Sequence, residues 1–238
     1  MPTDPRWLSS FLITGLTVTA CGAHATGGDG APTLHETPVE RLGTAPPGTG
    51  LQIGDHAPEV TLVAVTGEAY RISEAYAARP VFVVFYRGGW CPFCNLQLHE
   101  LAQAKTELDR RGVGVVAISV DLPGEEARTE ARQGVPFPIL SDPKLVAHRA
   151  FNVVHVADAA QVKRLAGLGI DLDAYAGESH HSFAIPSIFL VDRSGVIRFV
   201  HVDEDYETRP SARQLMQIAE RVLAAPAATP VTERRGSP

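Results

Sequence analysis

A strand that runs directly into a C-x-x-C loop and then into a long helix constrains the fold of this chain more than any other feature. Residues 81–86, V-F-V-V-F-Y, are a continuous β-branched and aromatic run, typical of a central strand buried on both faces. After the loop R-G-G-W-C-P-F-C, Leu98, Leu101 and Leu108 repeat at helical spacing, and Gly112 predicts the end of the helix. This order of elements indicates an α/β sheet.

Strands and helices alternate along the rest of the region from residue 51 to residue 223. Buried strands are expected over 113–120, 188–191 and 196–202, and the last two flank the turn D-R-S-G. Amphipathic helices are expected over 124–133 and 211–223. We therefore predict one domain over residues 51–223, with a mixed central sheet and helices on both faces.

Composition excludes several classes of protein. The hydrophobic fraction of 45% and the charged fraction of 20% are those of a soluble globular protein, not of a disordered or multi-span membrane chain. The 21 basic and 27 acidic residues give a net charge of -6, so we expect no nucleic-acid partner. Three cysteines are too few for a disulfide-stapled fold, which directs attention to their chemistry.

The N-terminal residues predict export. Residues 8–20 are apolar or small, too few to span a bilayer but long enough for a signal peptide, and V-T-A-C then resembles a bacterial lipobox. We expect a lipoprotein-type signal peptide over 1–20, lipidation of Cys21 and a membrane-anchored protein of the cell envelope, facing the periplasm or the exterior. The alternative is a short buried segment with a chance cysteine.

Residues 21–50 are rich in Gly, Pro, Thr and Ala, with no helical or strand period. Such a segment buries too little apolar surface to offset its ordering entropy, so we predict a flexible tether. The same reasoning predicts a flexible tail over 224–238.

The C-x-x-C pair is the candidate site. Cys91 follows the strand at the N-terminus of the helix, where the helix dipole stabilises a thiolate, and Pro92 is tolerated at the first helical position. Cys94 lies one turn later, close enough to form a disulfide. Gly88 and Gly89 allow a tight turn. We expect Cys91 to be the exposed thiol with the lower pKa.

Other uses of the two cysteines are weighed against redox chemistry. A zinc site lacks a second C-x-x-C, and c-type haem attachment lacks a histidine at Asn95. Two unreactive buried cysteines remain an alternative. We expect no metal and no cofactor.

The segment F-Y-R-G-G-W-C-P-F-C-N-L-Q-L resembles the active-site segment of the peroxiredoxin-like, AhpC/TSA-type branch of the thioredoxin superfamily. G-D-H-A-P at 54–58 is similar to the opening of those domains, and I-P-S-I-F at 185–189 to the segment whose cis-proline faces the C-x-x-C. The resemblance implies a thioredoxin-like fold and a cis bond before Pro186. It also makes Arg87, Trp90 and Phe93 part of the active-site loop.

The two family patterns disagree about the cysteines. In the thioredoxin register Cys91 attacks first. Thioredoxins carry a buried aspartate six residues before that cysteine, and here this position holds Phe85. In the peroxiredoxin register the attacking cysteine falls on Cys94, the neighbouring threonine on Cys91 and the proline on Arg87. The peroxidase arginine of that family falls on Pro186, so its usual position holds no cation.

Residues outside the loop receive structural interpretations. Trp90 is expected to pack over the disulfide. His180 and His181 are expected to be solvated loop residues, with a general-base role as the alternative. Residues 204–206 are expected to form a solvated turn.

These patterns predict a thiol peroxidase of peroxiredoxin type, in which the cysteine pair reduces a peroxide and a dithiol donor restores it. The alternatives are a thiol-disulfide oxidoreductase acting on protein disulfides and a non-enzymatic envelope lipoprotein.

Overall fold

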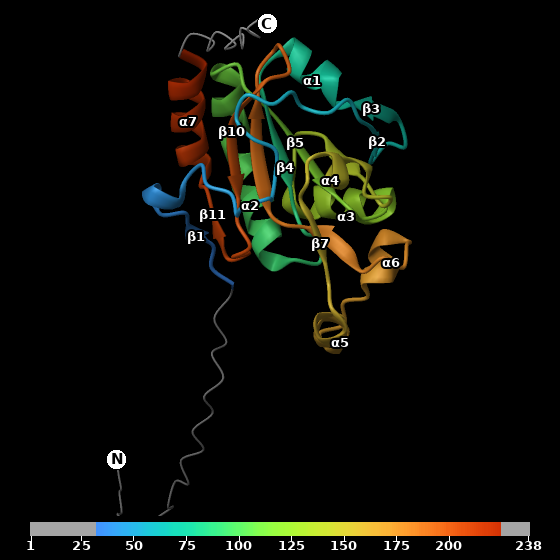
Figure 1. The fold of residues 1–238 in the computed structure, drawn as a ribbon. Coiled ribbons are helices and arrows are strands. Elements are labelled where there is room, and N and C mark those ends of the chain that lie inside the picture. Colours follow the sequence, from blue (N-terminus) through green and yellow to red (C-terminus); the bar gives the residue numbers. More distant parts are fainter. Residues whose placement is uncertain (1–31, 225–238) are drawn as a thin grey trace, which may run out of the picture. The chain divides into compact units, whose positions relative to one another are not determined.

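The computed structural model describes residues 32–224, and its centre is a seven-stranded mixed sheet. The strands of this sheet are β2 (Thr61–Ala64), β3 (Ala69–Arg71), β4 (Val81–Phe85), β5 (Gly114–Ser119), β6 (Ile139–Ser141), β9 (Ser187–Val191) and β10 (Ile197–Val202). Their order is β10-β9-β4-β5-β6-β2-β3. The central strands β4, β5 and β6 are parallel, and every further strand is antiparallel to its neighbour (Figure 1).

Helices cover both faces of the sheet. They are α1 (Ile72–Ala78), α2 (Pro92–Arg110), α3 (Pro123–Gln133), α4 (Val146–Ala150), α5 (Ala159–Gly167), α6 (Leu172–Ala176) and α7 (Ala212–Ala224). Side chains of α2 and α7 join one buried cluster, and side chains of α1 and α4 join the cluster on the opposite face. The predicted α/β class, the mixed sheet and the hairpin between β9 and β10 are confirmed, and the fold is thioredoxin-like.

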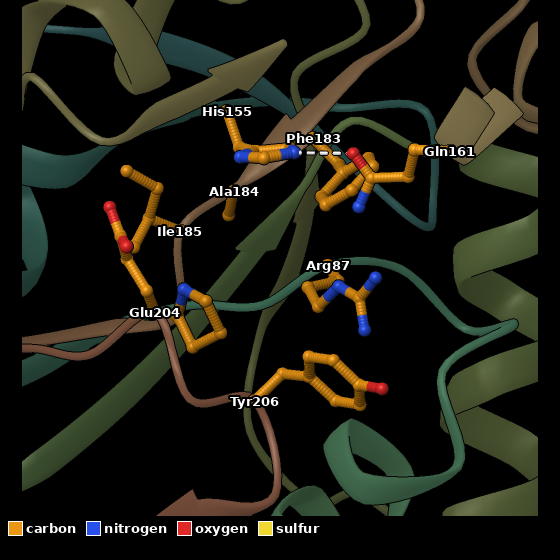
Figure 2. A pocket seen from close by; sticks show the side chains of 9 residues that line it. Arg87, His155, Gln161, Phe183, Ala184, Ile185, Glu204 and Tyr206 are labelled. Carbon is orange, nitrogen blue, oxygen red and sulfur yellow. Dashed lines mark hydrogen bonds between the residues drawn. The ribbon is translucent and has the colours of Figure 1, made fainter. Parts of the chain in front are cut away.

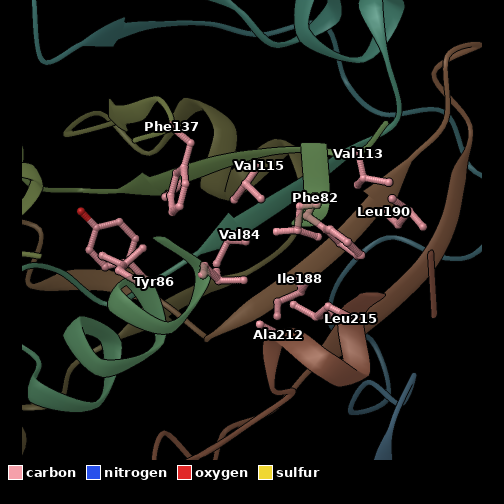
Figure 3. Close-up of a cluster of buried hydrophobic side chains, with 14 of the residues drawn as sticks. Phe82, Val84, Tyr86, Val113, Val115, Phe137, Ile188, Leu190, Ala212 and Leu215 are labelled. Atoms are coloured by element: carbon pink, nitrogen blue, oxygen red, sulfur yellow. The ribbon is translucent and has the colours of Figure 1, made fainter. Parts of the chain in front are cut away.

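The central strand β4 explains how the core divides. Because alternate side chains of a strand point to opposite faces, Phe82 and Val84 pack beneath α2 and α7 together with Leu215 (Figure 3). Phe85 points the other way and meets Phe151, with ring centroids 5.0 Å apart. Burial of each such side chain contributes about 1.5–3 kcal/mol, so both layers hold β4, and the loop that follows it, in place.

Residues 32–50 differ from the predicted tether. β1 (His35–Glu36) pairs in parallel with β11 (Thr208–Arg209), a short 3-10 helix covers Val39–Arg41, and Thr37 is buried. The amide of Gly50 donates to the carbonyl of Asn152 (2.8 Å). The prediction was wrong here because composition does not reveal hydrogen bonds to a strand far along the chain. The expected signal peptide (1–20), Cys21 and residues 22–31 and 225–238 lie outside the described residues.

An insertion between β6 and β9 adds a small second layer beside the loop. β7 (Val154–Val156) and β8 (Ser182–Ala184) form an antiparallel pair, and α5 and α6 connect them. Its core includes Leu165, Leu172 and Phe183, and Trp90 of the loop packs against it. Within residues 32–224, no helix has the length and apolar character needed to cross a membrane.

Candidate active site

Cys91 and Cys94 lie at the junction of the loop and α2, as the sequence indicates. Cys91 directly precedes Pro92, the first residue of α2, and Cys94 lies in its first turn. Both thiols are free, and their residues are 1% and 0% exposed. The expectation of an exposed Cys91 is wrong, because Cys91 joins the apolar cluster between β4 and α2 and Arg87 lies against its sulfur.

Arg87 separates the thiols from the surface. Its Nη1 lies 3.8 Å from the sulfur of Cys91. Its guanidinium carbon lies 4.8 Å from the ring centres of Trp90 and Phe183 and 4.2 Å from that of Tyr206. Figure 2 shows the guanidinium between the Phe183 and Tyr206 rings. Cation–π attraction of this kind holds the charge beside the dithiol.

The surroundings of the two thiols shift their pKa values in opposite directions. Burial raises the pKa of Cys94, but the hydrogen bond from Cys91, the charges of Arg209 and Arg87 and the amide of Arg87 lower it to about 6. The hydrogen bond to Cys94 and burial raise the pKa of Cys91. These surroundings favour the thiolate at Cys94, whereas the sequence analysis expects the lower pKa at Cys91.

Two glycines let the loop approach its neighbours. Gly88 adopts φ +142°, a backbone conformation that L side chains rarely adopt, and a Cβ there would collide with the Trp90 indole. A Cβ on Gly89 would collide with Oγ1 of Thr129 in α3. The amide of Gly89 donates to Oδ2 of Asp121 (2.7 Å). The loop is thus fixed to the end of β5 and to α3.

A buried acidic cluster lies behind the loop. The Tyr86 hydroxyl and the Ser119 hydroxyl donate to the two carboxylate oxygens of Glu126, the latter at 2.6 Å. Burial and the charge of Asp121 hold the pKa of Glu126 well above its ordinary value. Burial also raises the pKa of Asp121 to about 7. Asp121 interacts with both Glu126 and Cys94, so it links the titration of the buried carboxyls to that of the thiol.

A pocket of about 250 Å³ opens over Arg87. Its lining is Arg87, His155, Gln161, Phe183, Ala184, Ile185, Pro186, Glu204 and Tyr206 (Figure 2). Pro186 thus shares a pocket with Arg87, but the predicted cis bond is wrong, since residues 32–224 contain no cis peptide. The trans form, favoured by about 0.5–1 kcal/mol, is held by bonds from Ile185 N to Val153 O (2.8 Å) and from Asp203 N to Pro186 O (3.1 Å).

His180 and the turn over 204–206 make contacts that the sequence analysis does not predict. His180 Nε2 donates to the carbonyl of Pro143 (2.8 Å), which supports a structural role. The turn over 204–206 is exposed, as expected, and Tyr206 in addition stacks on Arg87 and lies 5.6 Å from the Phe93 ring. No local signal distinguishes a stacking tyrosine from a surface one, because both ring partners lie more than 100 residues earlier in the chain.

Further residues of the site were missed by the sequence reasoning. His155 donates to Gln161 Oε1 (2.7 Å) in the pocket wall, and Arg209 and Asp121 act on Cys94 through their charges. The acidic residue directly after a buried strand was the available signal for Asp121. No comparable sequence pattern points to Arg209.

The arrangement of Cys91 and Cys94 supports chemistry at their sulfur atoms. Within the described part of the chain, no three His, Cys, Asp or Glu side chains gather in a way that could hold a metal ion. Two neighbouring thiols, one with a lowered pKa, provide a nucleophile and a partner for disulfide formation. The fold and these two residues together define a thioredoxin-like protein with a buried pair of free cysteines.

Comparison with known proteins gives the family. The model of the AhpC/TSA family matches residues 53–200, and the chain belongs to that family. It is 34% identical to peroxiredoxin Bcp of Escherichia coli K12 over 92 residues, which make up 39% of this chain and 58% of that protein. It is 26% identical to alkyl hydroperoxide reductase E of Mycobacterium bovis over 161 residues, 67% of this chain and 90% of that protein.

Solved structures share the fold. The crystal structure of peroxidoxin BcpB from Mycobacterium tuberculosis superposes with a TM-score of 0.57 at 17% identity, covering 75% of this chain and 99% of that one. Reduced Prx3 from Vibrio vulnificus, in complex with H2O2, superposes with a TM-score of 0.60 at 15% identity, covering 74% and 99%. The matched region spans only 60% of the length of the curated M. tuberculosis relative, which is 36% identical over 95 residues.

Proposed function

We propose that this protein is a thiol peroxidase that uses Cys94 as the attacking cysteine and Cys91 as the resolving cysteine. The observation that carries the proposal is the buried pair of free thiols in the first turn of α2 with the Arg87 guanidinium 3.8 Å from the Cys91 sulfur, surroundings that lower the pKa of Cys94 to about 6. A thiolate, not a thiol, attacks peroxide. A pKa of about 6 makes Cys94 mostly thiolate at neutral pH. Membership of the AhpC/TSA family and the peroxiredoxin register of Cys94 support the same assignment.

The chemistry takes two steps on the protein. The Cys94 thiolate attacks one peroxide oxygen, the O–O bond breaks, and an S–O bond forms. Sulfur loses two electrons and becomes a sulfenic acid, while the other oxygen leaves as water or alcohol after taking up a proton. Cys91 then attacks Cys94, the S–O bond breaks, and the thiol proton leaves with the hydroxyl as water. A dithiol donor returns two electrons to the resulting disulfide.

Burial of both thiols argues for a small substrate. A protein disulfide has to bring its sulfur to within bonding distance of the attacking thiolate, and both sulfurs lie in residues that are at most 1% exposed. A peroxide is small and needs only a narrow passage to the thiols. Movement of the Arg87 side chain, which lines the pocket and contacts the Cys91 sulfur, would open one. The thiol-disulfide oxidoreductase therefore remains the second candidate, and a binding lipoprotein the third.

The location of the protein is also a proposal. The apolar residues 8–20 and the V-T-A-C that follows support lipidation of Cys21 and attachment to a membrane of the cell envelope. Lipidation would leave Cys91 and Cys94 to pair with each other in an oxidising compartment.

A single-turnover experiment tests the function. The reduced protein is mixed with hydrogen peroxide, or separately with a protein disulfide, and the loss of thiols is followed by stopped flow. We expect the peroxide reaction to be faster by orders of magnitude, with one peroxide consumed per dithiol. Reaction with the disulfide alone would establish the second candidate, and inertness to both would remove the enzymatic assignment.

The cysteine roles are separated by two matched variants. Cys91→Ser should still consume one peroxide and leave a sulfenic acid on Cys94 that dimedone traps, because the resolving thiol is gone. Cys94→Ser should lose the fast phase. The reverse pattern would assign attack to Cys91.

A further inference from the structure

Arg87 is held by aromatic rings rather than by a counter-charge. The residue is 6% exposed, and within residues 32–224 its side chain forms no ion pair with a carboxylate. A buried cation without a counter-charge is unfavourable, so other contacts have to offset its desolvation. Here the faces of three rings do so, those of Trp90, Phe183 and Tyr206, and we call these three residues the aromatic cage.

Two rings of the cage belong to a packed part of the protein. Phe183 lies in β8, is 3% exposed and joins the buried core of the insertion. Trp90 packs against the same core, and its ring meets that of Phe183 in a T-shaped contact with centroids 5.4 Å apart. These two rings therefore form a fixed wall on one side of the guanidinium.

Tyr206 forms the side of the cage that faces solvent. It is 39% exposed, and its ring lies 4.2 Å from the guanidinium carbon of Arg87 (Figure 2). Its hydroxyl has no hydrogen-bond partner within residues 32–224, so the face of the ring, not the hydroxyl, makes the contact with Arg87. Because the other wall is packed, the guanidinium can leave the cage on the side of Tyr206.

The turn that carries Tyr206 is fixed by contacts that its ring does not make. Nη2 of Arg41 pairs with Oδ2 of Asp203 (2.5 Å), and the amide of His35 donates to the carbonyl of Glu207 (2.9 Å). The pairing of β1 with β11 continues this connection. A substitution at Tyr206 therefore leaves the anchors of the turn in place.

Arg87 lies between the pocket and the thiols. It lines the pocket of about 250 Å³, whereas neither Cys91 nor Cys94 does. Its Nη1 is 3.8 Å from the sulfur of Cys91, and the two cysteines are 1% and 0% exposed. A molecule in the pocket thus meets the guanidinium before it meets a thiol.

We propose that Tyr206 is a specificity-determining residue, which positions Arg87 across the path from the pocket to the dithiol. A small displacement of the guanidinium admits a molecule of the size of hydrogen peroxide. A bulky reactant requires the guanidinium to leave the cage. The size limit for thiol reagents is independent of the reaction that the protein catalyses, whereas a preference among peroxides rests on the proposed function.

Two alkylating reagents with the same reactive group and different size test the proposal. They are iodoacetamide and N-(1-pyrenyl)iodoacetamide, applied to the reduced full chain carrying Cys21→Ser, so that Cys91 and Cys94 are the reacting thiols. The ratio of the two rates cancels the thiolate fraction, which both reagents share.

The variants separate the ring from the hydroxyl and from a general loss of packing. Tyr206→Ala removes the ring, and Tyr206→Phe keeps its face. Tyr76→Ala is the matched control, because Tyr76 of α1 is also half-buried but packs against the cluster on the opposite face of the sheet. Circular dichroism checks that each variant is folded.

The attraction between one ring and a partly desolvated guanidinium corresponds to a factor of roughly 5 to 30 in population. We therefore expect Tyr206→Ala to raise the rate of the pyrenyl reagent about tenfold and that of iodoacetamide less, so that the ratio rises. Tyr206→Phe and Tyr76→Ala should keep the parent ratio.

Three results overturn the proposal. They are an unchanged ratio in Tyr206→Ala, an equal rise in Tyr206→Phe, which would assign the effect to the hydroxyl, and an equal rise in Tyr76→Ala, which would mark a general loosening. If Tyr206→Ala does not fold, Phe183→Leu removes another ring face while keeping apolar bulk. The same rise in the ratio is expected there, and an unchanged ratio overturns the proposal.

Peroxide kinetics separate this proposal from the proposed function. If the parent protein reduces no peroxide but Tyr206→Ala still raises the alkylation ratio, the role of Tyr206 stands and the peroxidase assignment fails. If the parent reduces peroxide and the ratio is unchanged in Tyr206→Ala, the reverse holds. If both proposals are correct, Tyr206→Ala should reduce the preference for hydrogen peroxide over cumene hydroperoxide.

Discussion

The charge state of Cys94 is the residue-scale property on which the proposed chemistry depends. Because the surroundings lower the pKa of this thiol to about 6, the rate constant for peroxide should rise with pH, reach half its maximum near pH 6 and level off above about pH 7. Stopped-flow measurements on the reduced protein between about pH 4.5 and 9 give this profile. A midpoint near the value of an ordinary thiol, about 8.5, would contradict the assignment.

A second residue-scale prediction concerns Asp121 and stability. Burial raises the pKa of its carboxyl to about 7, against about 3.9 in an unfolded chain. A raised pKa means that the contribution to stability is complete below about pH 4 and is lost as the pH rises through about 7. Asp121→Asn keeps an acceptor for the Gly89 amide but cannot ionise. The variant should therefore lose less stability than the parent between about pH 4 and 8, by a few kcal/mol.

Urea unfolding of the two reduced proteins across this pH range measures the difference. Because the charge of Cys94 acts on Asp121, both proteins carry Cys94→Ser in this comparison, which removes the ionisation of that thiol. Parallel curves for the parent and the Asp121→Asn variant would show that the carboxyl keeps an ordinary pKa in the fold.

At the scale of elements, the loop between β4 and α2 is held by its contact with α3. A Cβ on Gly89 collides with Thr129 Oγ1, so Gly89→Ala should lower the free energy of unfolding by about 1–3 kcal/mol. Thr129→Ala removes the colliding oxygen and should recover part of the loss in the double variant. Gly124→Ala in the first turn of α3 has open space and is the matched control. Additive losses in the double variant would exclude the steric explanation.

At the scale of the whole molecule, the folded region begins well before the boundary expected from composition, because β1 pairs with β11. For the residues that precede the folded region, we propose export and lipidation of the protein. In the native host, mass spectrometry should find that residues 1–20 are missing and that Cys21 carries acyl chains. A Cys21→Ser variant should lack the acyl mass and leave the membrane fraction. An intact Met1 with an unmodified Cys21 would rule the proposal out.

The sequence by itself determined the central strands, the main helices and the position of the candidate site. The apolar run of β4, the helical repeat in α2 and the turn between β9 and β10 are local patterns, and each one formed the element that its period predicts. The C-x-x-C between a strand and a helix marked the dithiol for the same reason, since spacing along one helix turn is a local property.

Only the tertiary structure decided which thiol ionises and what surrounds it. A helix N-terminus favours Cys91 in a local argument, but the hydrogen bond between the two thiols and the charges of Arg209 and Arg87 favour the thiolate at Cys94. The same holds for the structured residues 32–50, the stacking of Tyr206 and the trans bond before Pro186. These features depend on groups distant in sequence, because burial and Coulomb interactions are set by distances in space rather than by spacing along the chain.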